Sequence, residues 1–113
     1  MSDTCIFCNI GAGRIPVAAV YDDGEFLAFP DNSPQAPVHV LLIPKQHYAT
    51  ILDVQDVEYL GRLMMAVQVT ADRLGLTEDG FRTVINSRDN GGQTVHHLHV
   101  HILGGRFMQW PPG

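Results

Sequence analysis

The chain has 113 residues, of which 45% are hydrophobic, and it carries a formal net charge of −5 at neutral pH. This length predicts one domain with a single core, the apolar content argues against disorder, and only seven lysines and arginines argue against a nucleic-acid-binding surface. Because the longest apolar runs are too short to span a bilayer and the N-terminal segment lacks a signal-peptide pattern, we expect a single cytoplasmic domain, residues 1–113, with no membrane partner.

The first part of the chain predicts a short helix and a β-hairpin. Residues 5–10 are expected to form the helix, which ends at the glycine-containing turn at 11–13. In AAVYDDGEFLAFPD, two strands over 18–22 and 25–30 flank an Asp-Gly turn at 23–24, a pattern that is typical of a hairpin.

The middle of the chain predicts a strand over 38–43 and then one long helix. Asp53 is the expected N-cap of that helix, with Asp56 in its first turn and Gly75 just past its end. Spacings of three and four residues predict a core-facing stripe of six apolar side chains: Val57, Leu60, Met64, Val67, Ala71 and Leu74.

The last part predicts two strands separated by a glycine-rich loop. One strand covers 80–88, the loop covers 89–92, and the second strand contains HLHVHI at 97–102. Because side chains alternate between the two faces of a strand, one face is expected to carry His97, His99 and His101, and the other Leu98, Val100 and Ile102. Strands joined by hairpins, with one long helix packed across them, predict an α+β fold with a mainly antiparallel sheet.

Three imidazoles on one face leave two interpretations open. All three could ligate a metal, as three histidines do in some catalytic zinc sites, or the central one could be a nucleophile whose neighbours manage protons and charge. No carboxylate lies between residues 90 and 113, and the preceding NSRDNGGQT offers glycines, neutral donors at Gln93 and Thr94, and a cation at Arg88. These features suit an anionic phosphoryl group and favour the nucleophile.

The same residues carry a family resemblance. HLHVHIL at 97–103 fits a pattern of alternating histidines and apolar residues, and the chain resembles the histidine-triad (HIT) superfamily, in its Hint branch of nucleotide-binding phosphoramidases. The likeness extends to SPQAPVHVLLIPKQH at 33–47, GGQTVHHLHVHILGGR at 91–106 and WPPG at 110–113. It implies a HIT-like fold, a five-stranded antiparallel sheet with one long and one short helix, which dimerises into a ten-stranded sheet.

The resemblance also implies an activity. Hint-like proteins bind purine nucleoside monophosphate derivatives and cleave the phosphorus–nitrogen bond of AMP–amine phosphoramidates through a nucleotidyl-histidine intermediate, with no metal required for the chemistry. In this chain the implied nucleophile is His99, and the further catalytic histidines are His39, His97 and His101. The implied nucleotide-binding residues are Ile6, Phe7, Ile10, Phe29 and Leu41 for the base, Asp31 for the ribose, and Asn86, Gln93, Thr94, His99 and His101 around the phosphate.

Two positions depart from the usual Hint pattern. The family often has serine where this chain has Thr94, and the hydroxyl is kept. Relatives often carry an aromatic residue where this chain has His96, for which the sequence indicates no role. For Asp31, an Asx turn within PDNSP is an alternative to ribose binding.

The cysteines predict a separate site. Cys5 and Cys8 have the C-x-x-C spacing that suits a shared tetrahedral metal, although a redox pair and two inert thiols are alternatives. Zinc needs two further ligands, and the resemblance to HIT relatives with this cysteine pair implies His47 and His97. We therefore expect a structural zinc, with His97 as a ligand.

The C-terminal tail predicts an assembly. Trp110, the only tryptophan, sits where a monomer would leave the chain frayed, and in Hint relatives the tail reaches the partner's active site. We therefore expect a homodimer in which the tail, 104–113, reaches the partner protomer. Two functional alternatives stay open: a Fhit-like dinucleoside polyphosphate hydrolase, which the WPPG ending disfavours, and a non-catalytic nucleotide- or partner-binding module, which the intact triad disfavours.

Overall fold

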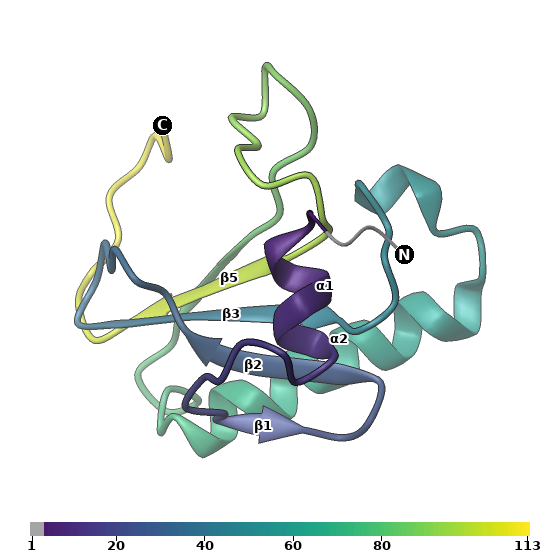
Figure 1. Ribbon diagram of the computed structural model, residues 1–113. Coiled ribbons are helices and arrows are strands. Elements are labelled where there is room, and N and C mark those ends of the chain that lie inside the picture. The colour runs from purple at the N-terminus through teal and green to yellow at the C-terminus, as the bar shows by residue number, and fades with distance from the viewer. Residues whose placement is uncertain (1–3) are drawn as a thin grey trace.

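The computed structural model describes residues 4–113 and folds them around one five-stranded antiparallel sheet (Figure 1). The order of strands across the sheet is β1-β2-β3-β5-β4. In chain order the elements are α1 (Ile6–Gly11), β1 (Tyr21–Asp22), β2 (Phe26–Pro30), β3 (Val38–Pro44), the 3₁₀ helix η1 (Ile51–Asp53), α2 (Val57–Arg73), β4 (Arg82–Val84) and β5 (Val100–Gly104). The α+β class, the antiparallel sheet and the long and short helices are confirmed.

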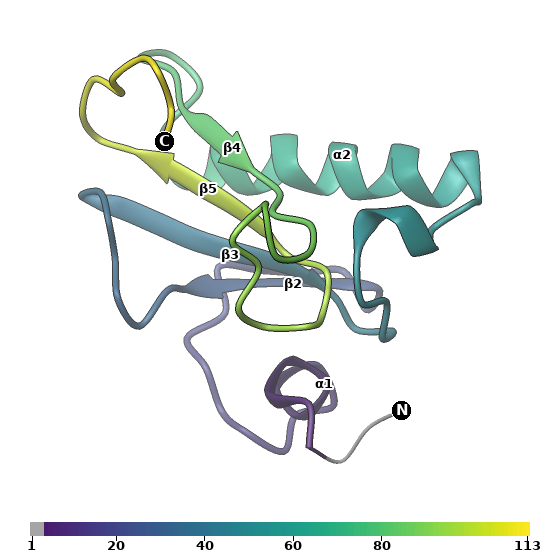
Figure 2. The ribbon, with the colours of Figure 1, turned by 90° about the horizontal axis from the view of Figure 1, so that it is seen from above.

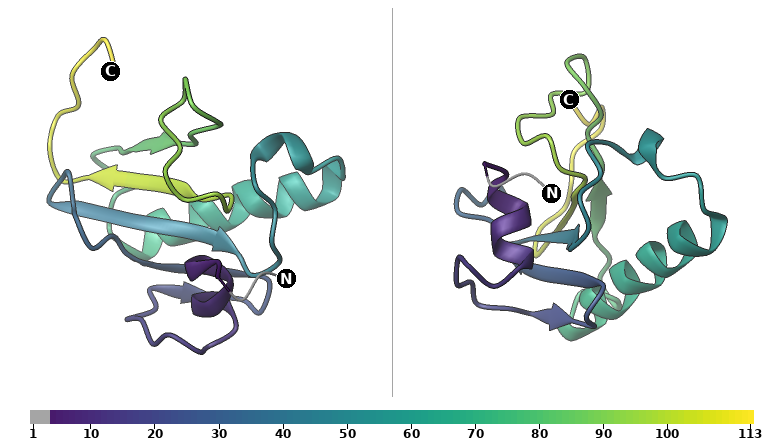
Figure 3. Two further views of the ribbon diagram at one scale, coloured as in Figure 1. Left: turned by 45° about the horizontal axis from the view of Figure 1, so that its top comes forward. Right: turned by 45° about the vertical axis from the view of Figure 1, so that its right-hand side comes forward.

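The two helices cover opposite faces of the sheet, as Figure 2 shows from above and Figure 3 from two further sides. This arrangement explains why β2 and β3 read as nearly continuous apolar runs instead of alternating ones, since both of their faces are buried. On the α2 side lie Phe26, Ala28, Val40, Leu42, Leu98, Val100 and Ile102; on the α1 side lie Leu27, Phe29, Leu41 and Ile43. The predicted facing of Leu98, Val100 and Ile102 is confirmed.

The long helix begins later than predicted. Asp53 belongs to η1, where its carboxylate accepts a hydrogen bond from the backbone N–H of Thr50 in a capping box. Asp56 is the N-cap of α2, because its carboxylate accepts the backbone N–H of Glu58 at 3.0 Å. The prediction of Asp53 as the N-cap of the long helix is therefore wrong: Asp53 completes the capping box of η1, whose N-cap is Thr50, and Asp56 caps α2.

The predicted core stripe of α2 is wrong at two positions. Val67 and Ala71 are buried, and Leu60 and Leu74 pack at the margin of the core. Val57 is 81% exposed and Met64 is 42% exposed. The buried face is Tyr59, Leu63, Ala66, Val67, Thr70 and Ala71, because the helix is rotated so that the neighbouring stripe meets the sheet.

Several strands are shorter than predicted. The strand expected over 18–22 is only Tyr21–Asp22, at the edge of the sheet, and the one expected over 80–88 is only Arg82–Val84. The histidine strand begins at Val100 instead of residue 97, because Leu98 N–H donates to the carbonyl of Tyr48 and leaves the sheet pairing. Among residues 4–113 no helix is long and apolar enough to cross a membrane.

Candidate functional site

The sheet brings His39 and His101 together. In the antiparallel pairing of β3 with β5, Leu41 lies opposite His101, so His39 is the diagonal neighbour of His101 on the same face. Their imidazoles meet, with His39 Nε2 at 2.9 Å from His101 Nδ1. Two histidines that are 62 positions apart in sequence thus form one pair on the face that α1 covers.

His99 holds its ring in one orientation through its own backbone. Its Nδ1 lies 2.6 Å from the carbonyl oxygen of His97, so Nδ1 carries the proton and donates it to that oxygen. The neutral ring therefore has an unprotonated Nε2. The side chain is buried, and its ring lies edge-on to Phe7 at 5.1 Å and beside His101 at 5.0 Å. An unprotonated nitrogen held in this way is the form of imidazole that attacks phosphorus.

His101 is neutral at physiological pH. Desolvation by burial, together with the neighbouring His99 and His39, lowers its pKa to about 4, although Asp31 acts in the opposite direction. Three close imidazoles could not all carry a positive charge without repulsion. The site therefore presents His101 as a neutral hydrogen-bonding ring and not as an imidazolium acid.

A pocket of about 420 Å³ lies between α1, the loop after it, the ends of β2 and β3, and the histidines. It unites nine of the predicted nucleotide-binding residues: Ile6, Phe7, Ile10, Phe29, Asp31, Leu41, Thr94, His99 and His101. Its lining has an apolar part, which includes Ile6, Phe7 and Ile10, and an imidazole part formed by His99 and His101. Phe7 joins the two parts, because its ring packs edge-on against Phe29 as well as against His99.

Four predicted site residues do not line this pocket: His39, Asn86, Gln93 and His97. His39 lies behind His101. Gln93 is buried, its amide donates to the carbonyls of Ala49 and Val95, and its Oε1 accepts the backbone N–H of Arg88. This side chain fixes the glycine-rich loop in place, and in this conformation its donors are used by backbone.

The sequence missed a further wall of the pocket. Ile15, Pro16 and Val17, between α1 and β1, line it opposite the strands, and Val95 lines it beside Thr94. The first three form an apolar run that contains a proline, lies outside any predicted helix or strand, and follows the predicted base-binding helix closely in the chain. In the structure this run is partly exposed, which is typical of side chains that line a binding site.

The structure shows the Asx turn at Asp31, and the residue also lines the pocket. Its Oδ1 accepts the backbone N–H of Ser33 at 2.7 Å, which is the Asx turn. Its Oδ2 lies 3.5 Å from His39 Nε2, and the residue lines the pocket. One oxygen therefore shapes the loop while the other faces the site.

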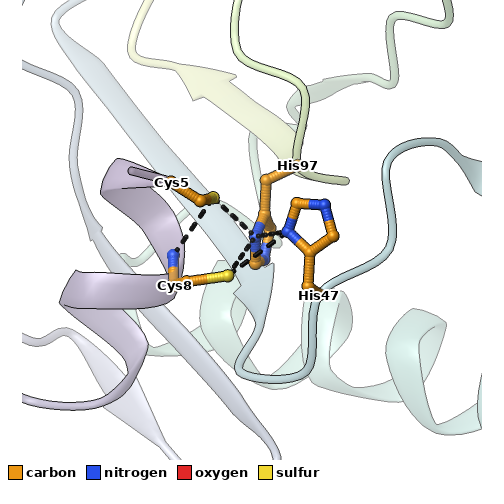
Figure 4. Close-up of side chains that lie close together, drawn as sticks. All are labelled: Cys5, Cys8, His47 and His97. Carbon is orange, nitrogen blue, oxygen red and sulfur yellow. Dashed lines mark hydrogen bonds between the residues drawn. The ribbon is translucent and has the colours of Figure 1, made fainter. Parts of the chain in front are cut away.

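The second cluster is the predicted metal site, and its four side chains converge (Figure 4). Cys5 and Cys8 come from α1, His47 from the loop after β3, and His97 from the segment before β5. His97 Nδ1 lies 3.3 Å from Cys5 Sγ, 3.6 Å from Cys8 Sγ and 3.2 Å from His47 Nδ1. Cys8 Sγ lies 3.3 Å from His47 Nδ1.

These residues fit zinc. Zn–S bonds of about 2.3 Å and Zn–N bonds of about 2.0–2.1 Å place tetrahedral ligand atoms roughly 3.3–3.8 Å apart, close to the separations seen here. His97 Nε2 donates to the carbonyl of Pro44 at 2.8 Å, so its Nδ1 lone pair faces the cysteines. Burial lowers the pKa of His97, which keeps the ring neutral as ligation requires.

The cysteine cluster and the environment of His99 share one residue. The side chain of His97 belongs to the cysteine cluster, whereas its backbone carbonyl orients His99. Of the three triad histidines, His97 is therefore the one that supports the site from outside the pocket. His96, the residue without a predicted role, is exposed and lines a separate surface hollow together with Thr94 and Val95.

Comparisons with known proteins agree with this geometry. The HIT domain family matches residues 12–108. An uncharacterised HIT-like protein of Synechococcus elongatus is 51% identical over 115 residues, 100% of both chains. A 14 kDa zinc-binding protein of Zea mays is 46% identical over 112 residues, 96% of this chain and 87% of that one. The crystal structure of a HIT family hydrolase from Legionella pneumophila superposes with a TM-score of 0.92 at 49% identity, covering 97% of this chain and 100% of that chain.

Proposed function

The chain belongs to the HIT domain family, and from this membership and the geometry of its site we propose that it is a nucleotide hydrolase that cleaves the phosphorus–nitrogen bond of purine nucleoside phosphoramidates. The observation that carries the proposal is the orientation of His99. Its Nδ1–H is held by the carbonyl of His97, and the ring with its unprotonated Nε2 lines a pocket of about 420 Å³ that apolar side chains also line. The hydrolase named among its solved relatives supports the reaction class.

The proposed reaction has two displacements. His99 Nε2 attacks the α-phosphorus, the P–N bond breaks, and the amine leaves after its nitrogen has taken up a proton. Positive charge then develops on the imidazole of His99, and the 2.6 Å hydrogen bond from its Nδ1–H to the His97 carbonyl stabilises that charge. Water next attacks the phosphorus, the P–Nε2 bond breaks, and the nucleoside monophosphate and neutral His99 are released. The attacking water gives up a proton to solvent, which balances the proton that the amine took up from solvent in the first displacement.

The rest of the pocket binds and orients the nucleotide. The planar base suits the apolar side formed by Phe7, Ile10 and Leu41, where burial of its faces is favourable. In this proposal Asp31 accepts hydrogen bonds from the ribose hydroxyls, and Thr94 and His101, which line the same pocket, donate to the phosphoryl oxygens. Because the pKa of His101 is lowered to about 4, its contribution is that of a neutral donor throughout the physiological range.

Zinc is proposed as a structural ion that Cys5, Cys8, His47 and His97 would hold. When bound it supplies a cross-link between α1 and the two segments that carry the histidines. The zinc-binding protein of Zea mays among the relatives supports this assignment. No step of the reaction passes through the metal.

A direct comparison of substrates tests the reaction. We expect the purified protein to release amine and AMP from an adenosine phosphoramidate with a kcat/KM at least about a hundredfold above that for a dinucleoside polyphosphate. Ion-exchange chromatography of the products measures both reactions. The reverse preference would assign the chain to the Fhit-like activity, and AMP binding by calorimetry without turnover of either substrate would indicate a binding module.

We also propose that the protein is a homodimer. Helix α2 carries a stripe of exposed apolar side chains, Val57, Met64, Met65 and Val69, and strand β4 is an edge of the sheet. In the tail, Phe107 is 84% exposed and Trp110 is 80% exposed. A two-fold axis beside β4 would cover the helix stripe and join two sheets into a ten-stranded one.

Light scattering tests the dimer and truncation tests the tail. We expect a dimer mass at micromolar concentration and a monomer mass for Met65→Glu, because a buried charge in the interface is unfavourable. Exposed Glu78→Lys, away from the stripe, is the control and should stay dimeric.

Deleting residues 107–113 should change the preference among amine leaving groups more than the affinity for AMP. A wild-type monomer refutes the dimer, and an unchanged leaving-group profile refutes the role of the tail.

A further inference from the structure

Apart from the cysteine cluster, another group of side chains, next to His99, has the composition of a metal site. One ligand atom each from Asp31, His39 and His101 lies within 4.8 Å of the others, which is a set of two histidines and one carboxylate. Such a set binds first-row transition metals in many enzymes. An ion bound there would engage the His101 ring, which faces the phosphate in the proposed reaction. The positions of the ring protons on these histidines therefore determine whether His101 can donate to the phosphate or the cluster can bind a metal.

A backbone group fixes the tautomer of His39. The N–H of Gln35 points at Nδ1 of His39 over 3.0 Å. A backbone N–H can only donate, so Nδ1 must accept and cannot carry a proton. The neutral ring of His39 therefore carries its proton on Nε2.

The fixed tautomer propagates to His101. His39 Nε2–H donates to His101 Nδ1 at 2.9 Å, whereas Asp31 Oδ2 is farther from the same nitrogen, at 3.5 Å. Because Nδ1 of His101 accepts this bond, the neutral ring of His101 carries its own proton on Nε2. The low pKa of His101 is consistent with this neutral form. The backbone N–H of Gln35 thus determines, through His39, which nitrogen of His101 is a donor.

The turn after β5 holds Gln35 in position. Arg106 Nη2 donates to the carbonyl of Gln35 at 3.0 Å, and the side-chain amide of Gln35 donates to the carbonyl of Ser33 at 2.9 Å. Gly105, which has a φ of +89°, lies so close to Pro37 that a Cβ atom at residue 105 would come within 2.8 Å of the proline ring. The loop at 33–37 is therefore braced from the strand that carries His101.

We propose that the backbone N–H of Gln35, braced by Arg106, is a positioning group that keeps His39 protonated on Nε2, makes His101 a donor to the phosphate, and excludes transition metals from the Asp31–His39–His101 cluster. A metal on His39 Nε2 would force the ring proton onto Nδ1, where the Gln35 N–H already points. Zinc is thereby directed to the cysteine cluster alone. The part concerning phosphate rests on the proposed function; the tautomers and the metal exclusion do not.

Nitrogen-15 NMR of the histidine rings, with no substrate present, tests the tautomers. In the wild-type zinc-loaded protein we expect His39 to show an unprotonated Nδ1 and a protonated Nε2 at pH 7, and His101 to show the same pattern. We also expect one zinc per chain by native mass spectrometry, even in excess zinc. A protonated Nδ1 on His39, or a second zinc retained by the wild-type protein, overturns the proposal.

Two substitutions at one position isolate the N–H. Gln35→Pro removes the backbone donor, whereas Gln35→Ala keeps it and removes only the side-chain amide. We expect Gln35→Pro to show mixed tautomers at His39, to retain a second zinc or cobalt ion, and to be inhibited by that metal, while Gln35→Ala keeps the wild-type tautomers and one zinc per chain. Wild-type tautomers and one zinc per chain in folded Gln35→Pro overturn the proposal.

Arg106 provides the test that does not alter the loop itself. Arg106→Ala should lower kcat on an adenosine phosphoramidate roughly tenfold with KM little changed, as is typical when a residue that orients a catalytic group is lost. It should also broaden the His39 ring signals, and Arg106→Lys should restore both properties in part. Arg106→Ala with wild-type kcat and sharp His39 signals contradicts the bracing role. Failure of the proposed function would appear differently, as inactivity of the wild type with the expected tautomers in place.

Discussion

Replacing His99 with asparagine should reduce turnover of an adenosine phosphoramidate on the order of 10⁴-fold or more while AMP still binds. The imidazole supplies the only attacking atom in the proposed reaction, and its loss removes the covalent route altogether. Asparagine keeps a polar side chain of similar size, so the pocket that Phe7 and His101 share with it should persist. Single-turnover kinetics measures the chemical step, and calorimetry with AMP measures binding.

A matched control makes the result specific. His96→Asn is the same chemical change three positions earlier in the chain, at an exposed residue outside the pocket wall. This variant should keep turnover within about threefold of the wild type, as surface substitutions usually do. If His99→Asn also stays within tenfold, the assignment of the nucleophile is wrong. Mass spectrometry of quenched wild-type reactions should in addition find the nucleotidyl adduct on the peptide that contains His99.

The overall fold was largely predictable because its main signals are local. The alternation in HLHVHI placed Leu98, Val100 and Ile102 on the buried side, and the Asp-Gly turn located the first hairpin. Helix orientation was harder. The spacing of three and four residues on α2 fits two neighbouring stripes, and the sequence does not say which stripe meets the sheet and which stays exposed, as Val57 and Met64 do.

The strand bounds failed for a different reason. His97 and His99 lie in a segment that pairs with the loop after β3, through Leu98 N–H and the Tyr48 carbonyl, instead of continuing β5. Such pairing depends on a loop 50 residues earlier in the chain, so no local pattern carries it. Because this segment does not continue β5, the ring of His97 can turn toward the cysteines while its carbonyl turns toward His99.

Within the site, side-chain chemistry was predictable and backbone chemistry was not. Histidines, cysteines and Asp31 are recognisable from residue type and spacing, and the structure brings most of them together. The N–H of Gln35 leaves no trace in the sequence, because every residue except proline supplies the same group. Gln93 shows the converse limit: its amide suggested a phosphate donor, but the fold uses that amide to hold the glycine-rich loop.

Zinc should account for much of the stability of the protein. The four proposed ligands would tie α1 to segments that lie 39 and 92 positions away in the chain, and α1 itself has only six residues, too few to be stable alone. Losing the ion would free α1, and with it Phe7, which forms part of both the pocket and the α1-side core. Metal removal is therefore expected to act through the fold.

We expect native mass spectrometry to find one zinc per chain and Cys5→Ser to lower that occupancy strongly. Stripping the metal with a chelator should lower the melting temperature by on the order of 10 °C or more, because an ion bound only by the folded state contributes its binding free energy to stability. His96→Ala, which changes an exposed histidine beside the cluster, should keep both the zinc and the melting temperature. At 20 °C the stripped protein should retain measurable turnover, since His99 attacks without help from the metal. Activity that disappears on chelation in a still-folded protein, and returns in proportion to added zinc, would instead make the ion catalytic and remove the basis for treating His97 as a structural ligand.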